Sequence, residues 1–227
     1  MKWYHKKLFK LLEYAQKPYH LAFIMDGNRR WAVKSGKEKP EGHRYGLDKL
    51  VEVLEWCLEI GVQVISVFAF SIDNFKRPKE EVDELMSLVL KACSRLKQET
   101  AVVQEKGVRI KVAGDIHKFP LEQQEALKDL EDSTAKHTGC TLYLCLGYGG
   151  LEDVQAASKV TSGDLLEHLQ VPYQVDLLVR TGESRLSNFL LYQVNQNTKF
   201  LMLKNLLWPE MTAWNFFWII FKYQHML

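Results

Sequence analysis

The stretch HLAFIMDGNRRW, residues 20–31, decides the fold, because an apolar run ends there abruptly at Asp26 and Gly27 and two arginines follow at once. A short apolar run bounded by polar residues and glycine predicts a buried strand of an α/β sheet. Ligands of such sheets bind beyond the carboxyl ends of the strands. The sequence therefore predicts that Asp26 lies at the ligand-binding edge of a sheet.

The residues around this strand end have the chemistry of a diphosphate site. Gly27 lets a ligand approach the backbone, Arg29 and Arg30 offer forked donors, and a helix beginning near Asn28 would add unpaired N–H groups. Phosphates would repel Asp26 unless a divalent cation lay between them, and Mg²⁺ is usually held by one or two carboxylates plus substrate phosphates. Asp26 is therefore a candidate Mg²⁺ ligand. The alternative is a solvated strand end with a capping aspartate, and the motif alone does not decide between the two.

Composition fits one large α/β domain without a nucleic-acid partner. The chain has 227 residues, 47% of them hydrophobic, and a net charge of +2, too small for nucleic-acid binding driven by bulk electrostatics. A phosphate site must then come from local clustering, for which a solvated basic face is the alternative. The basic residues that cluster are Arg29, Arg30, Lys34, Lys37, Lys39, His43 and Arg44.

The N-terminal residues and the cysteines bear on the compartment. Residues 1–18 interleave lysines with apolar side chains and predict an amphipathic helix, not a signal peptide, ahead of a domain at 19–227. Such a helix either lies on an anionic membrane or packs against its own domain. The four cysteines lack zinc-ligand spacing and are expected to be reduced core residues of a cytoplasmic protein, and no segment reaches transmembrane length.

Further apolar runs predict a central, mostly parallel sheet of about six strands flanked by helices. The strands after the first are expected at 64–70, 108–114, 141–148, 175–179 and 199–203. The main helices are expected at 47–60, 79–106, 120–138, 188–196 and 211–223. The helix at 79–106 has a broad apolar face that suits either the core or an apolar substrate, and the last helix is apolar enough for a subunit interface.

Parallel strands place their carboxyl ends at one edge of the sheet. Ser71 and Asn74, at the end of the second strand, should then face Asp26. Arg180, Arg185 and Ser187 follow the fifth strand and form a second cluster of phosphate donors. Two such clusters on one edge imply two phosphorylated ligands or one long ligand.

Seven segments, in order and at family-like spacing, make the chain resemble the cis-prenyltransferases, the undecaprenyl and dehydrodolichyl diphosphate synthases. They are HLAFIMDGNRRWA, EGHRYG, FAFSIDNFKRP, the turn at Gly114 and Asp115, GYGG, RTGESRLSNFLLYQ and LLWPE. The resemblance implies a single catalytic domain with an apolar tunnel beneath the active edge. It also implies extension of an allylic diphosphate, typically farnesyl diphosphate, by isopentenyl diphosphate units with Z geometry.

The resemblance assigns roles by position. Asp26 would support Mg²⁺ and departure of the allylic diphosphate, and Ser71 and Asn74 would face the reacting carbons. The expected ligands of the allylic diphosphate are Gly27, Asn28, Arg29, Arg30, Lys39 and His43, and those of isopentenyl diphosphate are Arg180, Arg185 and Ser187. The tunnel is expected to be lined by Phe68, Phe70, Phe75, Leu85, Val89 and Cys93.

Two departures from the family pattern bear on diphosphate binding: Lys39 replaces a usual arginine, and the loop from Arg180 to Arg185 is one residue short. Other departures resemble the eukaryotic catalytic subunits: the bacterial glutamate metal ligand is absent, Arg29 replaces a bacterial glycine, and the helix before Gly107 is longer. The C-terminal R-x-G motif is not in this sequence, so the resemblance implies a second, non-catalytic subunit similar to the Nogo-B receptor. It also implies dolichol synthesis for protein glycosylation on the cytosolic face of the endoplasmic reticulum.

Two alternatives remain at this point. A non-catalytic subunit of the same fold would typically lose the strand-end aspartate and the arginines, which this chain keeps. An unrelated nucleotide-binding module would be expected to carry G-x-x-x-x-G-K-[ST] or G-x-G-x-x-G, and neither is present.

Overall fold

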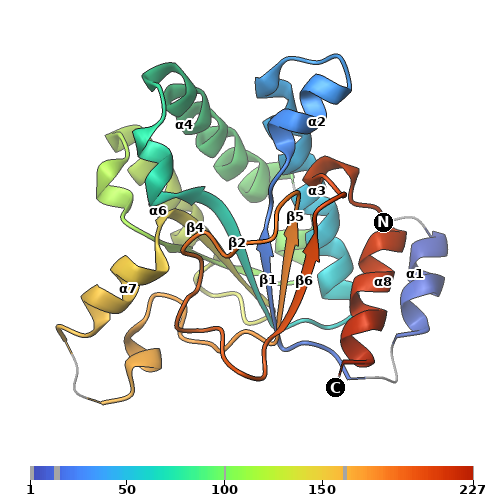
Figure 1. The fold of residues 1–227 in the computed structure, drawn as a ribbon. Coiled ribbons are helices and arrows are strands. Elements are labelled where there is room, and N and C mark those ends of the chain that lie inside the picture. The colour runs from blue at the N-terminus through green and yellow to red at the C-terminus, as the bar shows by residue number, and fades with distance from the viewer. Residues whose placement is uncertain (1–2, 13–15, 100, 161–162, 227) are drawn as a thin grey trace.

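A single six-stranded parallel sheet forms the centre of the computed structural model, which describes residues 3–12, 16–99, 101–160 and 163–226 (Figure 1). Every strand pair is parallel, and the strand order is β3-β4-β2-β1-β5-β6. The strands are β1 (His20–Ile24), β2 (Val64–Ser71), β3 (Arg109–Ala113), β4 (Thr141–Tyr148), β5 (Leu177–Thr181) and β6 (Lys199–Leu203). The predicted fold class is confirmed.

Helices flank this sheet and connect its strands (Figure 1). They are α1 (Trp3–Lys10), α2 (Asn28–Lys34), α3 (Lys39–Glu59), α4 (Lys79–Ser94), α5 (Ala101–Glu105), α6 (Leu121–Thr134), α7 (Gly150–Ala157) and α8 (Ala213–Gln224). None of the helices in these ranges combines the length and apolarity that crossing a membrane requires.

Strand β1 lies inside the sheet, and all five of its residues are buried. Its last residue, Ile24, is in register with Phe68 of β2 and with Arg180 of β5. The segments that follow these three strands therefore leave the sheet at the same edge, as the parallel arrangement requires.

Two predicted helices have different bounds in the structure. Helix α3 begins at Lys39, eight residues before the expected start at 47, because Glu38 and Glu41 form a capping box and Pro40 occupies the first turn. The expected continuous helix at 79–106 is α-helical only to Ser94, and a π-helical turn at Arg95–Glu99 separates it from α5.

The predicted helix at 188–196 was wrong. Ser187, Asn188 and Leu190 have φ angles of 52°, 62° and 47°, which a right-handed helix does not contain. Phe189 and Leu190 are fully buried, so the apolar spacing of this segment reflects loop residues that insert into the core.

Helices α1 and α8 lie side by side (Figure 1), and their contact is apolar. The ring of Phe9 packs edge-on against that of Phe216 with centroids 5.6 Å apart, and Phe9 and Leu12 are buried. One face of the N-terminal segment therefore packs against the domain. Leu11 keeps 73% of its surface exposed, and residues 1–2 and 13–15 of this predicted helix lie outside the described residues.

His20 at the start of β1 gives a testable pH dependence. Its ring is fully buried between the Ser66 hydroxyl at 2.8 Å and the Gln174 carbonyl at 3.0 Å, and burial lowers the pKa of His20 to about 4. Below pH 6.5, the ordinary pKa of histidine, His20 binds a proton in the unfolded chain but remains neutral in the folded chain until the pH approaches 4. We expect this group to lower the free energy of unfolding by about 3 kcal/mol between pH 7 and pH 4.

Urea unfolding at a series of pH values measures this effect. His20→Gln should flatten the decline between pH 7 and pH 4, whereas His168→Gln, at an exposed position, should leave the decline unchanged. An undiminished decline in the His20 variant would contradict the assignment.

Candidate active site

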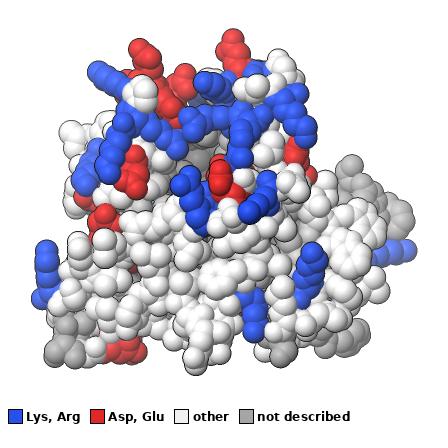
Figure 2. Space-filling model, in the orientation of Figure 1, with Lys and Arg blue, Asp and Glu red and all other residues white. Residues whose placement is uncertain are grey.

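A cavity of about 910 Å³ opens where β1, β2 and β5 end. Lys and Arg side chains surround a hollow on the same end of the molecule (Figure 2). All the predicted diphosphate-binding and catalytic residues line this cavity: Asp26, Gly27, Asn28, Arg29, Arg30, Lys39, His43, Ser71, Asn74, Arg180, Arg185 and Ser187. The structure therefore brings together residues that are up to 161 positions apart in the sequence.

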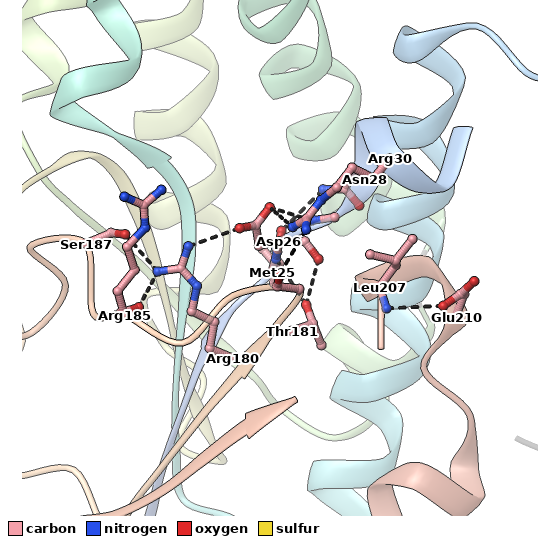
Figure 3. Close-up of polar contacts among 12 residues, drawn as sticks. Met25, Asp26, Asn28, Arg30, Arg180, Thr181, Arg185, Ser187, Leu207 and Glu210 are labelled. Carbon is pink, nitrogen blue, oxygen red and sulfur yellow. Dashed lines mark hydrogen bonds and ion pairs between the residues drawn. The ribbon is translucent and has the colours of Figure 1, made fainter. Parts of the chain in front are cut away.

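The Asp26 carboxylate lies between two guanidinium groups (Figure 3). Its Oδ2 accepts a hydrogen bond from Nη2 of Arg180 at 3.0 Å, and its Oδ1 lies 3.3 Å from Nη2 of Arg30. The N–H of Gly27 also donates to Oδ1 at 2.6 Å. The carboxylate side chain remains 34% exposed, so it is held in place and still faces the cavity.

The backbone of Asp26 is fixed as well. The Asp26 N–H donates to Oγ1 of Thr181 at 3.1 Å, and the Thr181 hydroxyl donates to the Asp26 carbonyl at 2.7 Å. The same carbonyl accepts from the N–H of Trp208 at 3.0 Å. Sequence reasoning missed Thr181, although its place as the last residue of the strand beside β1 was the available signal.

Gly27 is required by close packing. Its φ is 105°, and a Cβ at this position would lie 2.8 Å from Cδ2 of Leu207. A side chain here would be strained and would push against the segment that holds the Asp26 carbonyl.

Arg180 connects Asp26 with the loop after β5. Its Nη1 donates to Oγ of Ser187 at 2.7 Å and to the carbonyl of Arg185. Arg180 is only 4% exposed, so the nearby Asp26 carboxylate compensates for burying its charge. Among the described atoms its buried Nε has no hydrogen-bond partner.

A second set of charges lies on the α2 and α4 side of the cavity. One oxygen of Glu81 lies 3.0 Å from Nη1 of Arg29 and 2.6 Å from Nη1 of Arg77. Sequence reasoning named neither Arg77 nor Glu81 as a site residue, although their spacing of four residues at the start of α4 was a detectable signal.

His43 stands where the polar cavity meets apolar side chains. Burial, followed by the charges of Arg29 and Arg77, lowers the pKa of His43 to about 4. The imidazole is therefore neutral at pH 7 and offers one donor and one acceptor.

Ser71 and Asn74 are locked together at the end of β2. The Ser71 N–H donates to Oδ1 of Asn74 at 3.0 Å, and the Ser71 hydroxyl oxygen accepts from the N–H of Asp73 at 3.2 Å. This capping box sets both side chains on the wall of the cavity that Asp26 also lines, at the end of the strand beside β1.

A smaller apolar cavity of about 110 Å³ continues from the polar one. The residues that line both are Met25, Asn28, His43, Phe68, Ala69 and Leu85. Predicted tunnel residues Phe70, Val89 and Cys93 line the deeper part, where burial raises the pKa of the Cys93 thiol to about 11 and keeps it neutral. Phe75 lines neither cavity, because its ring packs against Phe70 with centroids 4.8 Å apart.

The donor set suits a cation held largely by its substrate. Within the described residues there is no group of three or more His, Cys, Asp or Glu side chains placed to hold a metal ion. Asp26 places its carboxylate between Arg30 and Arg180, whose guanidinium groups suit phosphate, and this arrangement fits Mg²⁺ bound through one carboxylate and substrate phosphates.

Comparison with known proteins gives consistent matches over nearly the whole α/β domain. Residues 24–226 match the undecaprenyl diphosphate synthase family model. The dehydrodolichyl diphosphate synthase complex subunit of Homo sapiens is 40% identical over 225 residues, which cover 91% of this chain and 67% of the human one. An isoprenyl transferase of Thermus thermophilus is 35% identical, with 97% of this chain and 91% of that one covered.

A solved structure gives the same result at the level of the fold. Lavandulyl diphosphate synthase from Lavandula x intermedia, in complex with dimethylallyl diphosphate, has a TM-score of 0.83 at 28% sequence identity. The alignment covers 92% of this chain and 95% of that one.

Proposed function

Because the chain belongs to the undecaprenyl diphosphate synthase family of cis-prenyltransferases, we propose that it extends farnesyl diphosphate with successive isopentenyl diphosphates in Z configuration. The observation that carries this proposal is the Asp26 carboxylate, which lies between Arg30 and Arg180 at the mouth of an apolar cavity. A non-catalytic subunit of the same fold is not favoured, because these charged groups are all in place.

The chemistry begins with departure of the allylic diphosphate. The carbon–oxygen bond breaks with its electron pair going to diphosphate, and Arg29, Arg30 and the N-terminal N–H groups of α2 stabilise the charge that develops on the leaving group. The neutral His43 adds a hydrogen bond without a competing charge. Mg²⁺, held by Asp26 and the phosphates, supplies additional charge stabilisation when bound.

Isopentenyl diphosphate is placed by the other cluster. Arg180, Arg185 and Ser187 bind its diphosphate, so its double bond lies near the allylic carbon. The double bond supplies the electron pair of the new carbon–carbon bond, which leaves a cationic carbon beside it. That carbon's CH₂ neighbour on the diphosphate side then loses a proton to the released diphosphate, and a new double bond forms. Ser71 and Asn74 use their oxygens as acceptors within the capping box, so the Ser71 O–H and the Asn74 NH₂ serve as donors near the reacting atoms.

The apolar cavity excludes water and receives the growing chain. Its walls come from α3, α4, α6, β2 and β4, and its lining is almost entirely aliphatic and aromatic. An allylic cation formed at its mouth is shielded from hydrolysis, and product carbons that enter it are removed from water.

The test of this reaction is incorporation of labelled isopentenyl diphosphate into products extracted after incubation with farnesyl diphosphate and Mg²⁺. We expect polyprenyl diphosphates, resolved by thin-layer chromatography, and no binding of ATP in a parallel equilibrium measurement. A chain that binds nucleotide and gives no extractable product would contradict the proposal.

Filling the apolar cavity should shorten the product. Val89 of α4 lies on its wall and is 8% exposed, so Val89→Phe reduces the space for product carbons. We expect chromatography to show shorter products with the first condensation retained. Val160→Phe, at a position 72% exposed, should leave the product distribution unchanged, and an unchanged distribution in Val89→Phe would contradict the role of this cavity.

The protein is proposed to work as a dimer with a non-catalytic, Nogo-B-receptor-like subunit. The human relative is named as a complex subunit, and α8 exposes Trp214 and Trp218 at 61% and 51% while its opposite face is buried. Aromatic side chains of this kind are enriched at protein interfaces.

An assembly test follows from this surface. Adding such a subunit should raise the elongation rate of the purified chain, and Trp214→Glu with Trp218→Glu should abolish the increase by removing the apolar contact. Leu121→Glu, at an exposed position on α6, is the matched control. A chain that is equally fast alone and with the subunit would contradict the dimer.

The similarity to the human dehydrodolichyl relative supports a role in dolichol synthesis for protein glycosylation. We place the protein in the cytoplasm, peripherally on the cytosolic face of the endoplasmic reticulum. The exposed Leu11 lies beside the exposed Lys10 on the N-terminal segment, a pairing that suits contact with an anionic lipid surface.

A further inference from the structure

The segment GYGG, residues 147–150, contacts the loop after β5 in two ways: Tyr148 packs edge-on against Phe189, with centroids 6.1 Å apart, and the backbone at Gly150 bonds to Asn188. The N–H of Gly150 donates to the Asn188 carbonyl at 2.7 Å, and the N–H of Leu151 donates to Oδ1 of Asn188 at 2.8 Å. Nδ2 of Asn188 donates to Oε2 of Glu152 at 2.8 Å. Helix α7 has Gly149 at its N-cap, which provides no side chain, so Asn188 supplies the missing cap from a distant part of the chain.

Two glycines make this contact possible. A Cβ on Gly149 would lie 2.1 Å from Oε2 of Glu152 and 2.8 Å from Nδ2 of Asn188. A Cβ on Gly150 would lie 2.8 Å from the backbone nitrogen of Leu191. Neither Gly149 nor Gly150 therefore has room for a side chain while the loop that carries Asn188 packs against α7.

The loop itself needs external support. Ser187, Asn188 and Leu190 have φ angles between 47° and 62°, a region that residues other than glycine rarely adopt. Between them, the ring of Phe189 is fully buried and stacks on Phe68 of β2 with centroids 4.5 Å apart and planes 15° from parallel. The Phe189 stack and the Asn188 contacts with α7 hold this backbone in its strained conformation.

The strained residues adjoin one of the two phosphate clusters. Ser187 immediately precedes Asn188, and its hydroxyl accepts from Arg180 at 2.7 Å, while the Arg185 carbonyl accepts from the same Arg180 nitrogen. Arg29 and Arg30 belong to α2, and their hydrogen bonds go to Glu81 and to the Gly182 carbonyl rather than to Asn188. Gly182 directly follows β5, whereas Ser187 adjoins Asn188, so loss of the Asn188 contacts should displace the Arg185 and Ser187 end of the loop more than the Arg30 contact.

We propose that Asn188 is a positioning residue for the isopentenyl diphosphate site, which it maintains by fastening the loop of Arg185 and Ser187 to the N-terminus of α7. This inference rests on the proposed function, which assigns isopentenyl diphosphate to that cluster. It gives the GYGG segment a role: its glycines admit the loop that the asparagine holds.

Steady-state kinetics of elongation test the inference. Asn188→Ala should raise the KM for isopentenyl diphosphate about tenfold and leave the KM for farnesyl diphosphate unchanged, a difference that general destabilisation would not produce. Asn195→Ala is the matched control, because Oδ1 of Asn195 also accepts a backbone N–H in the same segment, from Asn197 at 2.8 Å, but away from the cavity. It should change neither KM.

Exchange of donor and acceptor provides a rescue. Asn188→Asp alone places two carboxylates in contact and should raise the KM for isopentenyl diphosphate. Adding Glu152→Gln provides an amide donor for the new carboxylate and should lower this KM again. Equal changes in both KM values in Asn188→Ala, no change in either, or a double variant no better than Asn188→Asp would overturn the inference.

Arg185→Ala separates this inference from the proposed function. Arg185 lines the cavity and makes no contact with α7. If Arg185→Ala raises the KM for isopentenyl diphosphate and Asn188→Ala does not, the assignment of the site stands and the positioning role fails. If Arg185→Ala has no effect on that KM, the assignment of the site itself fails.

Discussion

Asp26→Ala should lower the rate of elongation about a thousandfold. The protein should remain folded but with a lower unfolding temperature, because the buried Arg180 loses its counter-charge. The substitution removes the carboxylate to which Arg30 and Arg180 are both paired, and with it the proposed ligand of Mg²⁺. It removes little apolar contact, because the side chain is 34% exposed, and the backbone bonds of Asp26 to Thr181 and Trp208 do not depend on the side chain. Incorporation of labelled isopentenyl diphosphate gives the rate, and thermal unfolding reports the state of the fold.

The matched control is Asp129→Ala on α6. Asp129 also pairs with a basic side chain, Lys97, and its side chain is 63% exposed, but it does not line the cavity. We expect its elongation rate to stay within about twofold of the unmodified chain, since exposed ion pairs contribute little. Near-normal elongation by Asp26→Ala would refute the role assigned to the carboxylate.

Arg180→Lys should lower kcat/KM for isopentenyl diphosphate about a hundredfold. The guanidinium fork reaches Asp26 through one terminal nitrogen and Ser187 and Arg185 through the other, and a single ammonium group cannot span these partners. The positive charge is retained, so the loss reports geometry rather than charge. The buried position also predicts a lower unfolding temperature, because partners of the lost nitrogens remain unpaired.

Arg109→Lys is the control for this substitution. Arg109 begins β3 at the outer edge of the sheet and does not line the cavity, so its replacement should leave kcat/KM unchanged. A fully active Arg180→Lys variant would show that a point charge suffices and that the forked contacts are dispensable.

The sheet and the charged cavity could be predicted from the sequence because both depend on short-range patterns. Apolar runs of strand length end directly in polar residues at Asp26, Ser71 and Arg180, and parallel topology alone then places these residues at one edge. No side-chain coordinates are needed for that step.

What the sequence did not reveal depends on contacts between distant segments. Thr181 holds the Asp26 backbone, and Glu81 pairs with both Arg29 and Arg77. The strand-end position of Thr181 and the spacing of Arg77 and Glu81 were visible in the sequence, but their partners lie in distant segments. The error at 188–196 has the same origin, because the apolar residues Phe189 and Leu190 are buried in a loop whose conformation depends on its contacts with α7 and β2. The break in the helix after Ser94 was also not predictable, because no glycine or proline occurs near it in the sequence.

The small size of the apolar cavity has a consequence for when synthesis stops. About 110 Å³ lies beneath the reaction site, enclosed by packed side chains such as Leu96 and Leu127. Each further isoprene unit must therefore separate side chains that are already in contact, and the free-energy cost of the lost packing rises with chain length. Elongation then ends when the cost of enlarging the cavity exceeds the gain from another condensation. Substitutions among the interior residues should therefore change product length without altering the charged residues of the site.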